Sequence, residues 1–414
     1  MTAPIFSHTF ENGLVLVAEV RTALRSAAFT FLLPCGTVHE PADRGGLSGF
    51  LCEMVQRGAG ERDSRRLVLD LDNLGVQCHD SVSAAHTGFG GATLAENLTE
   101  ALGIFADVLR RPHLPEEQLE AARLVMLQDL RAVEDEPGQK TVQQLRRRHY
   151  PDPWGRPPQG QQKSLEEVTL ADVRDHFARN YQPEGTILGV AGLFDWDELR
   201  ETVGELLGDW EPRPAAPVAE RPSAGQYEHL AYDSNQTHVG IALASVPYRD
   251  EDYYRAWGAA GILGGGMSSR LFTEVRERRG LCYHVDASHH SLKDRGAVFC
   301  YAGTSAERAQ ETLDVTFGEL RRLTDGIEQH ELDRLNSRIK AALIMQQESS
   351  SARSAAVARS WYHLGRVRTL EEIAERIDGL TVEGINAYLA EHPPGELTVV
   401  TLGPRELEVP FGVS

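Results

Sequence analysis

Apolar residues follow two alternating patterns along this chain. Short runs of apolar, β-branched and aromatic residues, such as 28–33 and 238–243, are typical of strands. Longer stretches at 116–134 and 328–348 repeat apolar residues at helical spacing. Strands mixed with segregated helices predict an α+β fold, in which helices pack on mainly antiparallel sheets.

Two threonines predict where helices begin. Thr169 and Thr381 are each followed within three positions by an acidic residue, as at many helix N-termini. Two other stretches predict less regular structure. Residues 349–354 indicate a loop or a weak helix, and the basic run at 146–149 indicates a solvated face after a helix.

The chain resembles itself at an offset near 212 residues. Four segments recur in the same order at this spacing, namely 28–33 with 238–243, 109–120 with 320–333, 168–173 with 380–385, and 186–192 with 397–403. Coincidence between generic amphipathic helices is the alternative, but it would not hold both order and spacing. We therefore predict two homologous domains, at 1–212 and 228–414. The Pro/Ala-rich stretch at 213–227 is the expected linker.

Composition narrows the protein class. The 414 residues are too many for one compact core. The net charge of −19 argues against nucleic acid and anionic membranes as partners and would tolerate basic peptides. No apolar run reaches the length of a membrane span, and the first residues predict no signal peptide. Five scattered cysteines without a CxxC pair favour a reducing compartment, so we expect a cytoplasmic protein.

Glycine-rich turns followed by helices occur at equivalent places in the two halves. The first half carries residues 45–59, the second carries 263–283, and shorter similarities occur at 154–160 and 181–185. On these segments the chain resembles the M16 (insulinase and mitochondrial processing peptidase) family of zinc peptidases, over essentially its whole length. The similarity is strongest at 263–283. The resemblance implies the half-length two-domain form and a LuxS/MPP-like fold.

The resemblance also implies where a zinc ion should bind. Family members carry His-x-x-Glu-His on a helix: two histidines one turn apart bind zinc, and the glutamate between them is the general base. A distant glutamate completes the ligands. The two histidine positions are Gly49 and Glu53 in this sequence, the base position is Cys52, and the distant ligand falls on Asp129. We therefore predict a degenerate site that binds no metal.

Another metal on Cys52, Glu53 and Asp129 is the alternative to an empty site. Adjacent residues on a helix point about 100° apart, so Cys52 and Glu53 do not share one face. Two carboxylates alone make a weak divalent site. We therefore interpret Cys52 as a small buried side chain and the two carboxylates as solvated or hydrogen-bonded.

The second half keeps a different part of the family pattern. Arg276 and Tyr283 match an Arg/Tyr pair that, in the family, binds the substrate backbone and the oxyanion from the domain opposite the zinc. A cation and a phenol are suitable donors for developing negative charge. The structural alternative is an exposed arginine and a core tyrosine. Gly264, Gly265 and Gly266 are expected to form a substrate-chamber loop through positive φ and close backbone approach.

These features predict the non-catalytic subunit of a heterodimeric zinc metallopeptidase that degrades unfolded peptides. Arg276 and Tyr283 would act in trans, and the zinc would belong to a paralogous partner. A homodimer is the other expected assembly. A structural protein of the respiratory core-subunit type and a peptidase with a non-standard metal site are the alternative functions. Residues 81–87 predict a strand that could pair with a bound peptide.

Overall fold

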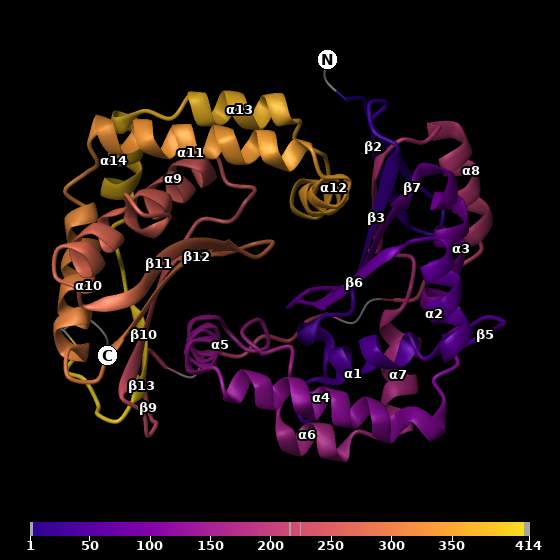
Figure 1. Cartoon of the computed structure of the whole chain (residues 1–414), viewed down its shortest axis with the longest axis horizontal. Helices are drawn as coiled ribbons and strands as arrows, with labels where there is room; N and C mark the ends of the chain where they lie inside the picture. Colours follow the sequence, from indigo (N-terminus) through magenta and orange to yellow (C-terminus); the bar gives the residue numbers. More distant parts are fainter. Residues whose placement is uncertain (1–2, 215–216, 224, 410–414) are drawn as a thin grey trace. The chain divides into compact units, whose positions relative to one another are not determined.

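The computed structural model describes residues 3–214, 217–223 and 225–409 (Figure 1). The chain forms two compact units. Unit 1 contains residues 1–132, 156–220 and 345–368, and unit 2 contains residues 133–155, 221–344 and 369–414. No helix in the described part of the chain is long and apolar enough to cross a membrane.

Unit 1 is built on a six-stranded sheet in the order β1-β2-β8-β3-β7-β6. Its neighbouring strands pair antiparallel except for β2 and β8, which are parallel. The strands are β1 (Ile5–Thr9), β2 (Val15–Val20), β3 (Ser26–Leu33), β6 (Gln77–Val82), β7 (Thr87–Leu94) and β8 (Ile187–Gly192).

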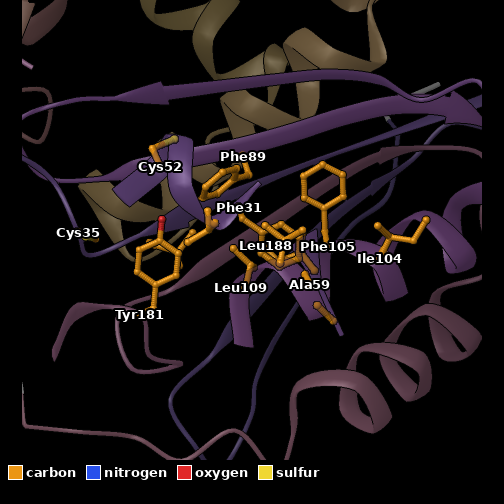
Figure 2. Packing of buried hydrophobic residues seen from close by; sticks show 14 of the residues in the cluster. Phe31, Cys35, Cys52, Ala59, Phe89, Ile104, Phe105, Leu109, Tyr181 and Leu188 are labelled. Atoms are coloured by element: carbon orange, nitrogen blue, oxygen red, sulfur yellow. The ribbon is translucent and has the colours of Figure 1, made fainter. Parts of the chain in front are cut away.

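Helices cover both faces of this sheet. Strand residues alternate between faces, so Leu16 and Ala18 join the main core while Val17 packs against Val357 of α12 (Ser350–Leu364). Figure 2 shows part of the main core, in which Phe31 and Leu188 from the sheet meet Phe105 from α3. The other helices of unit 1 are α1 (Leu47–Val55), α2 (Ser64–Asn73), α3 (Leu98–Arg110), α4 (Leu119–Glu134), α6 (Gln162–Glu167), α7 (Leu170–Asn180) and α8 (Trp196–Leu207).

Unit 2 repeats the same topology with one strand fewer. Its sheet has the order β11-β12-β10-β13-β9, and only β13 and β9 pair in parallel. The strands are β9 (Tyr227–Ala231), β10 (Gln236–Ser245), β11 (Cys282–Ser291), β12 (Gly296–Ser305) and β13 (Thr398–Gly403). The parallel pair therefore occupies the same place in both sheets, which confirms the internal duplication and the α+β fold.

Six α-helices lie in the described part of unit 2. They are α5 (Pro137–His149), α9 (Tyr253–Gly264), α10 (Ala309–Leu323), α11 (Gln329–Gln347), α13 (Leu370–Asp378) and α14 (Val382–Glu391). The long helices predicted at 116–134 and 328–348 are confirmed as α4, with a preceding 3-10 turn, and α11. Thr169 and Thr381 are N-caps, and each hydroxyl accepts a backbone N–H of its helix.

Two equivalent helices are exchanged between the chain halves. The first-half helix α5 packs on β10 and β13 of unit 2, whereas the second-half helix α12 packs on β2, β3 and β8 of unit 1. The compact units therefore differ from the sequence halves at these two helices. The division at 213–227 stays a prediction about the repeats. Residues 215, 216 and 224 lie outside the described residues, and the described remainder has an isolated bridge at Arg221 and, at its last residue, the start of β9.

Both segments expected to be irregular or solvated are packed at least in part. Residues 350–354 begin α12, in which Arg353 is 2% exposed and its Nε lies 3.0 Å from Oε2 of Glu19. At the end of α5, His149 packs edge-on against Phe299, and Arg148 forms an ion pair with Glu228 at 2.6 Å. Residues 350–354 thus form a helix, one of the two expectations, but a packed one. The basic run is solvated only in part, because Arg146 and Arg147 are exposed while Arg148 and His149 contact the sheet.

Candidate functional site

Helix α1 carries the positions that correspond to the zinc motif. It starts after Gly46, whose φ of 92° is in the left-handed region that favours glycine. The buried Glu40 carboxylate accepts the backbone N–H groups of Gly46 and Ser48 at 3.0 and 2.8 Å. Burial raises the pKa of Glu40 to about 7 despite these bonds. A fixed carboxylate therefore sets where α1 begins.

The first ligand position is filled by packing. A Cβ at Gly49 would lie 2.8 Å from the Cε methyl of Met126 and 3.2 Å from the carbonyl oxygen of Pro158. Met126 belongs to α4 and is 6% exposed. The thioether of Met126 thus occupies the space beside α1 that a side chain at position 49 would need.

Cys52 stands at the position of the general base and is a buried, protonated thiol. Its Sγ donates to Oδ2 of Asp80 on β6 at 3.4 Å, and its side chain is 2% exposed. Burial, and then the nearby Asp80 carboxylate, raise the pKa of Cys52 well above its ordinary value. Metal binding and base catalysis require the thiolate, so this thiol is suited to neither.

The two carboxylates at the remaining positions are not brought together. Glu53 forms an ion pair with Arg57 one turn later at 2.6 Å, and Arg57 also donates to Gln118. Asp129 is exposed on α4. Across residues 3–214, 217–223 and 225–409, no three His, Cys, Asp or Glu side chains gather as a metal site. The side chains at these positions do not fit a zinc ion.

Sequence reasoning missed the partners at this place. Arg57 could have been found, because it stands four residues after Glu53, the spacing at which charged side chains pair along a helix. Met126 and Asp80 could not, because they come from α4 and β6, far away in the sequence.

In unit 2 the triple glycine follows α9 and allows close packing. A Cβ at Gly264 would lie 2.1 Å from the backbone nitrogen of Ala287 in β11. The expected close approach is therefore confirmed. The expected positive φ is wrong: Gly264, Gly265 and Gly266 are absent from the left-handed glycines, and Gly265 has a φ of −80°. Glycine is required at 264 because any Cβ there would collide with β11, and not because the backbone is left-handed.

The structure brings Arg276 and Tyr283 together. Arg276 lies on a π-helical segment, Phe272–Glu277, and its guanidinium carbon is 5.2 Å from the Tyr283 ring centroid and 4.7 Å from that of Phe272. Tyr283 lies at a register shift between Cys282 and His284 in β11 and is 86% exposed. Bulges commonly re-aim side chains in this way. The alternative of a core tyrosine is wrong.

Neighbouring charges on this segment are satisfied without Arg276. The carboxylate of Glu274 pairs with Arg278 and Arg279, and these pairs lower the pKa of Glu274. No hydrogen bond or ion pair of the Arg276 guanidinium occurs within the part of the chain that the structure describes. Its guanidinium therefore keeps its donors free while two aromatic rings hold it in place.

The outer strand of the unit 1 sheet is a second candidate surface. Strand β6, Gln77–Val82, is the edge next to β7, and most of its residues are exposed. The predicted segment 81–87 covers only the end of this strand. Its other residues form a turn, in which Ser83 and His86 bond each other, and Thr87 is buried at the start of β7. The edge available for peptide pairing is therefore 77–82.

Comparison with known families identifies this fold. Residues 16–153 match the family described as insulinase (peptidase family M16), and residues 167–339 match the peptidase M16 inactive domain. The chain belongs to the M16 peptidase family. It is similar over its full length to two bacterial M16 relatives, both called uncharacterized zinc proteases. YmxG of Bacillus subtilis is 28% identical over 92% of this chain and 93% of that protein. Mb2805c of Mycobacterium bovis is 29% identical over 96% and 92%.

Solved structures share the M16 fold closely. A peptidase M16 inactive domain from Pseudomonas fluorescens superposes with a TM-score of 0.89 at 21% identity, covering 98% of this chain and 99% of that one. A protease from Helicobacter pylori gives 0.89 at 20% identity, covering 98% and 100%. A chain of Complex III2 from Candida albicans gives 0.82 at 18% identity, covering 97% and 96%. At these identities the likeness concerns the fold alone.

Proposed function

We propose that this chain is the non-catalytic subunit of a heterodimeric M16 zinc peptidase. Its partner would be a paralogue with an intact zinc motif, and its substrates would be unfolded peptides. The observation that carries the proposal is the exposed Arg276–Tyr283 pair, in which a guanidinium without a carboxylate partner stacks on a phenol.

The side chains at the zinc-motif positions of unit 1 support the proposal that the partner supplies the zinc. Met126 beside Gly49, the protonated thiol of Cys52 and the Glu53–Arg57 ion pair occupy the places where ligands and base would act. Each of the three is packed or bonded to its own neighbour. Unit 1 would therefore contribute fold and surface, including the exposed edge β6, while the partner supplies the zinc.

Arg276 and Tyr283 would act on the peptide backbone. The guanidinium and the phenol O–H can both donate to a carbonyl oxygen, and such bonds strengthen as negative charge develops on it. The aromatic rings on either side of Arg276 limit its rotamers, so less entropy is lost when a substrate binds.

A structural role without peptidase activity is the second candidate. It is favoured by the similarity in fold to a chain of Complex III2. In that case the chain would associate with its partner, but the Arg276–Tyr283 pair would contribute nothing to peptide turnover.

Co-expression with a zinc-motif M16 paralogue tests the proposal. We expect a stable complex that cleaves a fluorogenic unstructured peptide, while this chain alone is inactive. Arg276→Ala in the complex should lower kcat/KM by about 10²-fold, the usual effect of removing one oxyanion donor. Tyr283→Phe retains the ring and should show a smaller loss.

Arg278→Ala is the matched control, because Arg278 is also an arginine of this segment but pairs with Glu274. It should keep the turnover of the unmodified complex. A complex whose turnover is equal with and without Arg276 would support the structural role. Failure to associate, with a homodimer seen by light scattering, would overturn the heterodimer.

A further inference from the structure

Unit 2 contains a small polar cavity behind the glycine turn. It has a volume of about 70 Å³ and lies between α9, the turn that follows it and α11. Two arginines, two serines and one glutamate supply its polar groups, and the complete lining is Gly261, Ile262, Ser268, Ser269, Glu331, Arg334, Leu335 and Arg338. We call it the arginine–serine pocket.

The one acid in the arginine–serine pocket is already neutralised. Glu331 accepts two bonds from Arg270, at 2.7 and 2.8 Å, and a third from the backbone N–H of Glu328. Arg270 also donates to the carbonyl oxygens of Arg322 and Gly326. This buried network uses the carboxylate fully, so Glu331 does not balance the charge of the other two arginines.

Arg334 and Arg338 therefore leave a local excess of positive charge. They stand one turn apart on α11, so their like charges repel each other along one face of the helix. Arg334 donates only to the backbone carbonyl of His330, at 3.1 Å. Neither guanidinium pairs with a carboxylate within the described ranges of the chain, which is notable in a protein with a net charge of −19.

The glycine turn is shaped around Arg338. A Cβ at Gly265 would lie 2.6 Å from one terminal nitrogen of Arg338, and a Cβ at Gly266 would lie 2.3 Å from the other. Burial lowers the pKa of Arg338. The cation is partly desolvated without a counter-ion.

We propose that the arginine–serine pocket binds one small oxyanion, a phosphate or a carboxylate group, between Arg334, Arg338 and the hydroxyls of Ser268 and Ser269. The volume is about five times the space that one water needs. Guanidinium forks and hydroxyls are the usual donors to such anions. Leu335 and Ile262, both buried, supply the apolar part of the lining. The site is independent of the peptidase-subunit role.

Thermal unfolding of the full chain tests this site. Sodium phosphate should raise Tm in a saturable way, compared with sodium chloride at equal ionic strength. Arg338→Gln should weaken the apparent affinity at least tenfold. The matched control is Arg321→Gln, which removes an exposed arginine from α10 and should leave the affinity unchanged.

A variant of unchanged charge separates binding from general electrostatics. Gly266→Ala should displace the flexible head of Arg338, with little cost to the fold, and should also weaken phosphate binding. A second arm compares an acetylated dipeptide with a free C-terminal carboxylate against its amide. Stabilisation by the carboxylate form alone would assign the anion to a peptide terminus. Equal phosphate response in wild type, Arg338→Gln and Gly266→Ala, or no saturable response to either anion, would overturn the proposal.

Discussion

The buried polar side chains near α1 are held by hydrogen bonds, and His176 is the clearest case. The ring of His176 is 4% exposed; its Nε2 lies 3.0 Å from Ser48 Oγ, and its Nδ1 accepts from the Asn180 amide at 3.0 Å. Burial lowers the pKa of His176 to about 3, with smaller contributions from His39 and Arg179. The ring is therefore neutral in the folded protein at any pH well above 3.

This neutral histidine predicts a pH dependence of stability. The unfolded chain binds a proton at His176 below about pH 6.5, whereas the folded chain does so only near 3. Stability from this group is therefore complete above 6.5 and falls towards pH 3, by about 1.4 kcal/mol per pH unit for one proton. Urea unfolding of wild type and His176→Gln across this window should show a shallower loss in the variant.

Glu40 makes stability depend on pH in the opposite direction to His176, and it provides an internal control. Its folded pKa, raised to about 7 from 4.5, makes its contribution most favourable below 4.5, and that contribution is lost as the pH rises to 7. Both proteins contain Glu40, so its effect cancels in the difference between them. Parallel stability curves for wild type and variant would contradict the neutral state of His176.

At the scale of elements, α12 shows how a helix from one sequence half is held on the other half's sheet. Polar contacts fasten it: Ser354 bonds Thr30 at 3.0 Å, Ser350 bonds Ser26 at 3.2 Å, and Arg353 meets Glu19. A buried ion pair of this kind is costly to break, because the remaining charge has no partner. Such contacts specify one register for the helix on the sheet.

Close approach of α12 to β8 depends on Gly189. A Cβ there would lie 2.3 Å from the carbonyl oxygen of Ser354 and 2.9 Å from Cβ of Ala358, and backbone cannot yield cheaply. Gly189→Ala should therefore destabilise the protein by about 1–3 kcal/mol and increase hydrogen exchange within α12. Urea unfolding and exchange mass spectrometry measure the two effects.

Gly103→Ala is the matched control for this substitution. Gly103 lies inside α3, and the nearest atom to its added Cβ, from Leu206, is 4.0 Å away. Alanine there should stabilise the helix by about 0.5–1 kcal/mol. If both variants behaved alike, close packing of α12 on β8 would not be the reason for glycine at 189.

At the scale of the whole molecule, duplication preserved topology and let the chemistry of the two units diverge. The parallel strand pair recurs in each sheet, as do the exchanged helices α5 and α12. The glycine turn after α9 leaves room for β11 and for the guanidinium of Arg338, whereas Met126 fills the space beside Gly49 in unit 1.

Metal analysis of the purified chain tests this divergence. After dialysis against micromolar zinc we expect less than stoichiometric metal, because Cys52 stays protonated and Glu53 is paired with Arg57. Plasma mass spectrometry measures the content, and a zinc-motif paralogue treated identically is the positive control. One tightly held zinc per chain, lost in Cys52→Ala, would instead establish the non-standard metal site.

Much of the architecture could be predicted because it is written in local patterns. Helical periodicity located α4 and α11, and hydroxyl side chains located the starts of α7 and α14. The same local reasoning did not find the packing of α12 or of the last residues of α5. Their serines and arginines look solvated until Glu19 and Glu228, distant in sequence, become their partners.

The candidate site divides in the same way. The sequence by itself determined that no histidine stands at positions 49 and 53, and that Arg276 and Tyr283 are separated by one turn region. Residue identity at a motif position needs no coordinates. Only the tertiary structure decided that Met126 fills the place beside Gly49, that Asp80 binds the Cys52 thiol, and that Arg276 stacks on an exposed Tyr283.

The physical reason is the range of the interactions involved. Helix periodicity and capping act within a few residues, so the sequence determined the duplicated elements and their order. Burial, counter-ions and close packing join segments far apart, up to 334 positions in the case of Arg353 and Glu19. Which residues become partners depends on which elements pack together, and here α5 and α12 each pack on the sheet built mainly from the other half of the sequence.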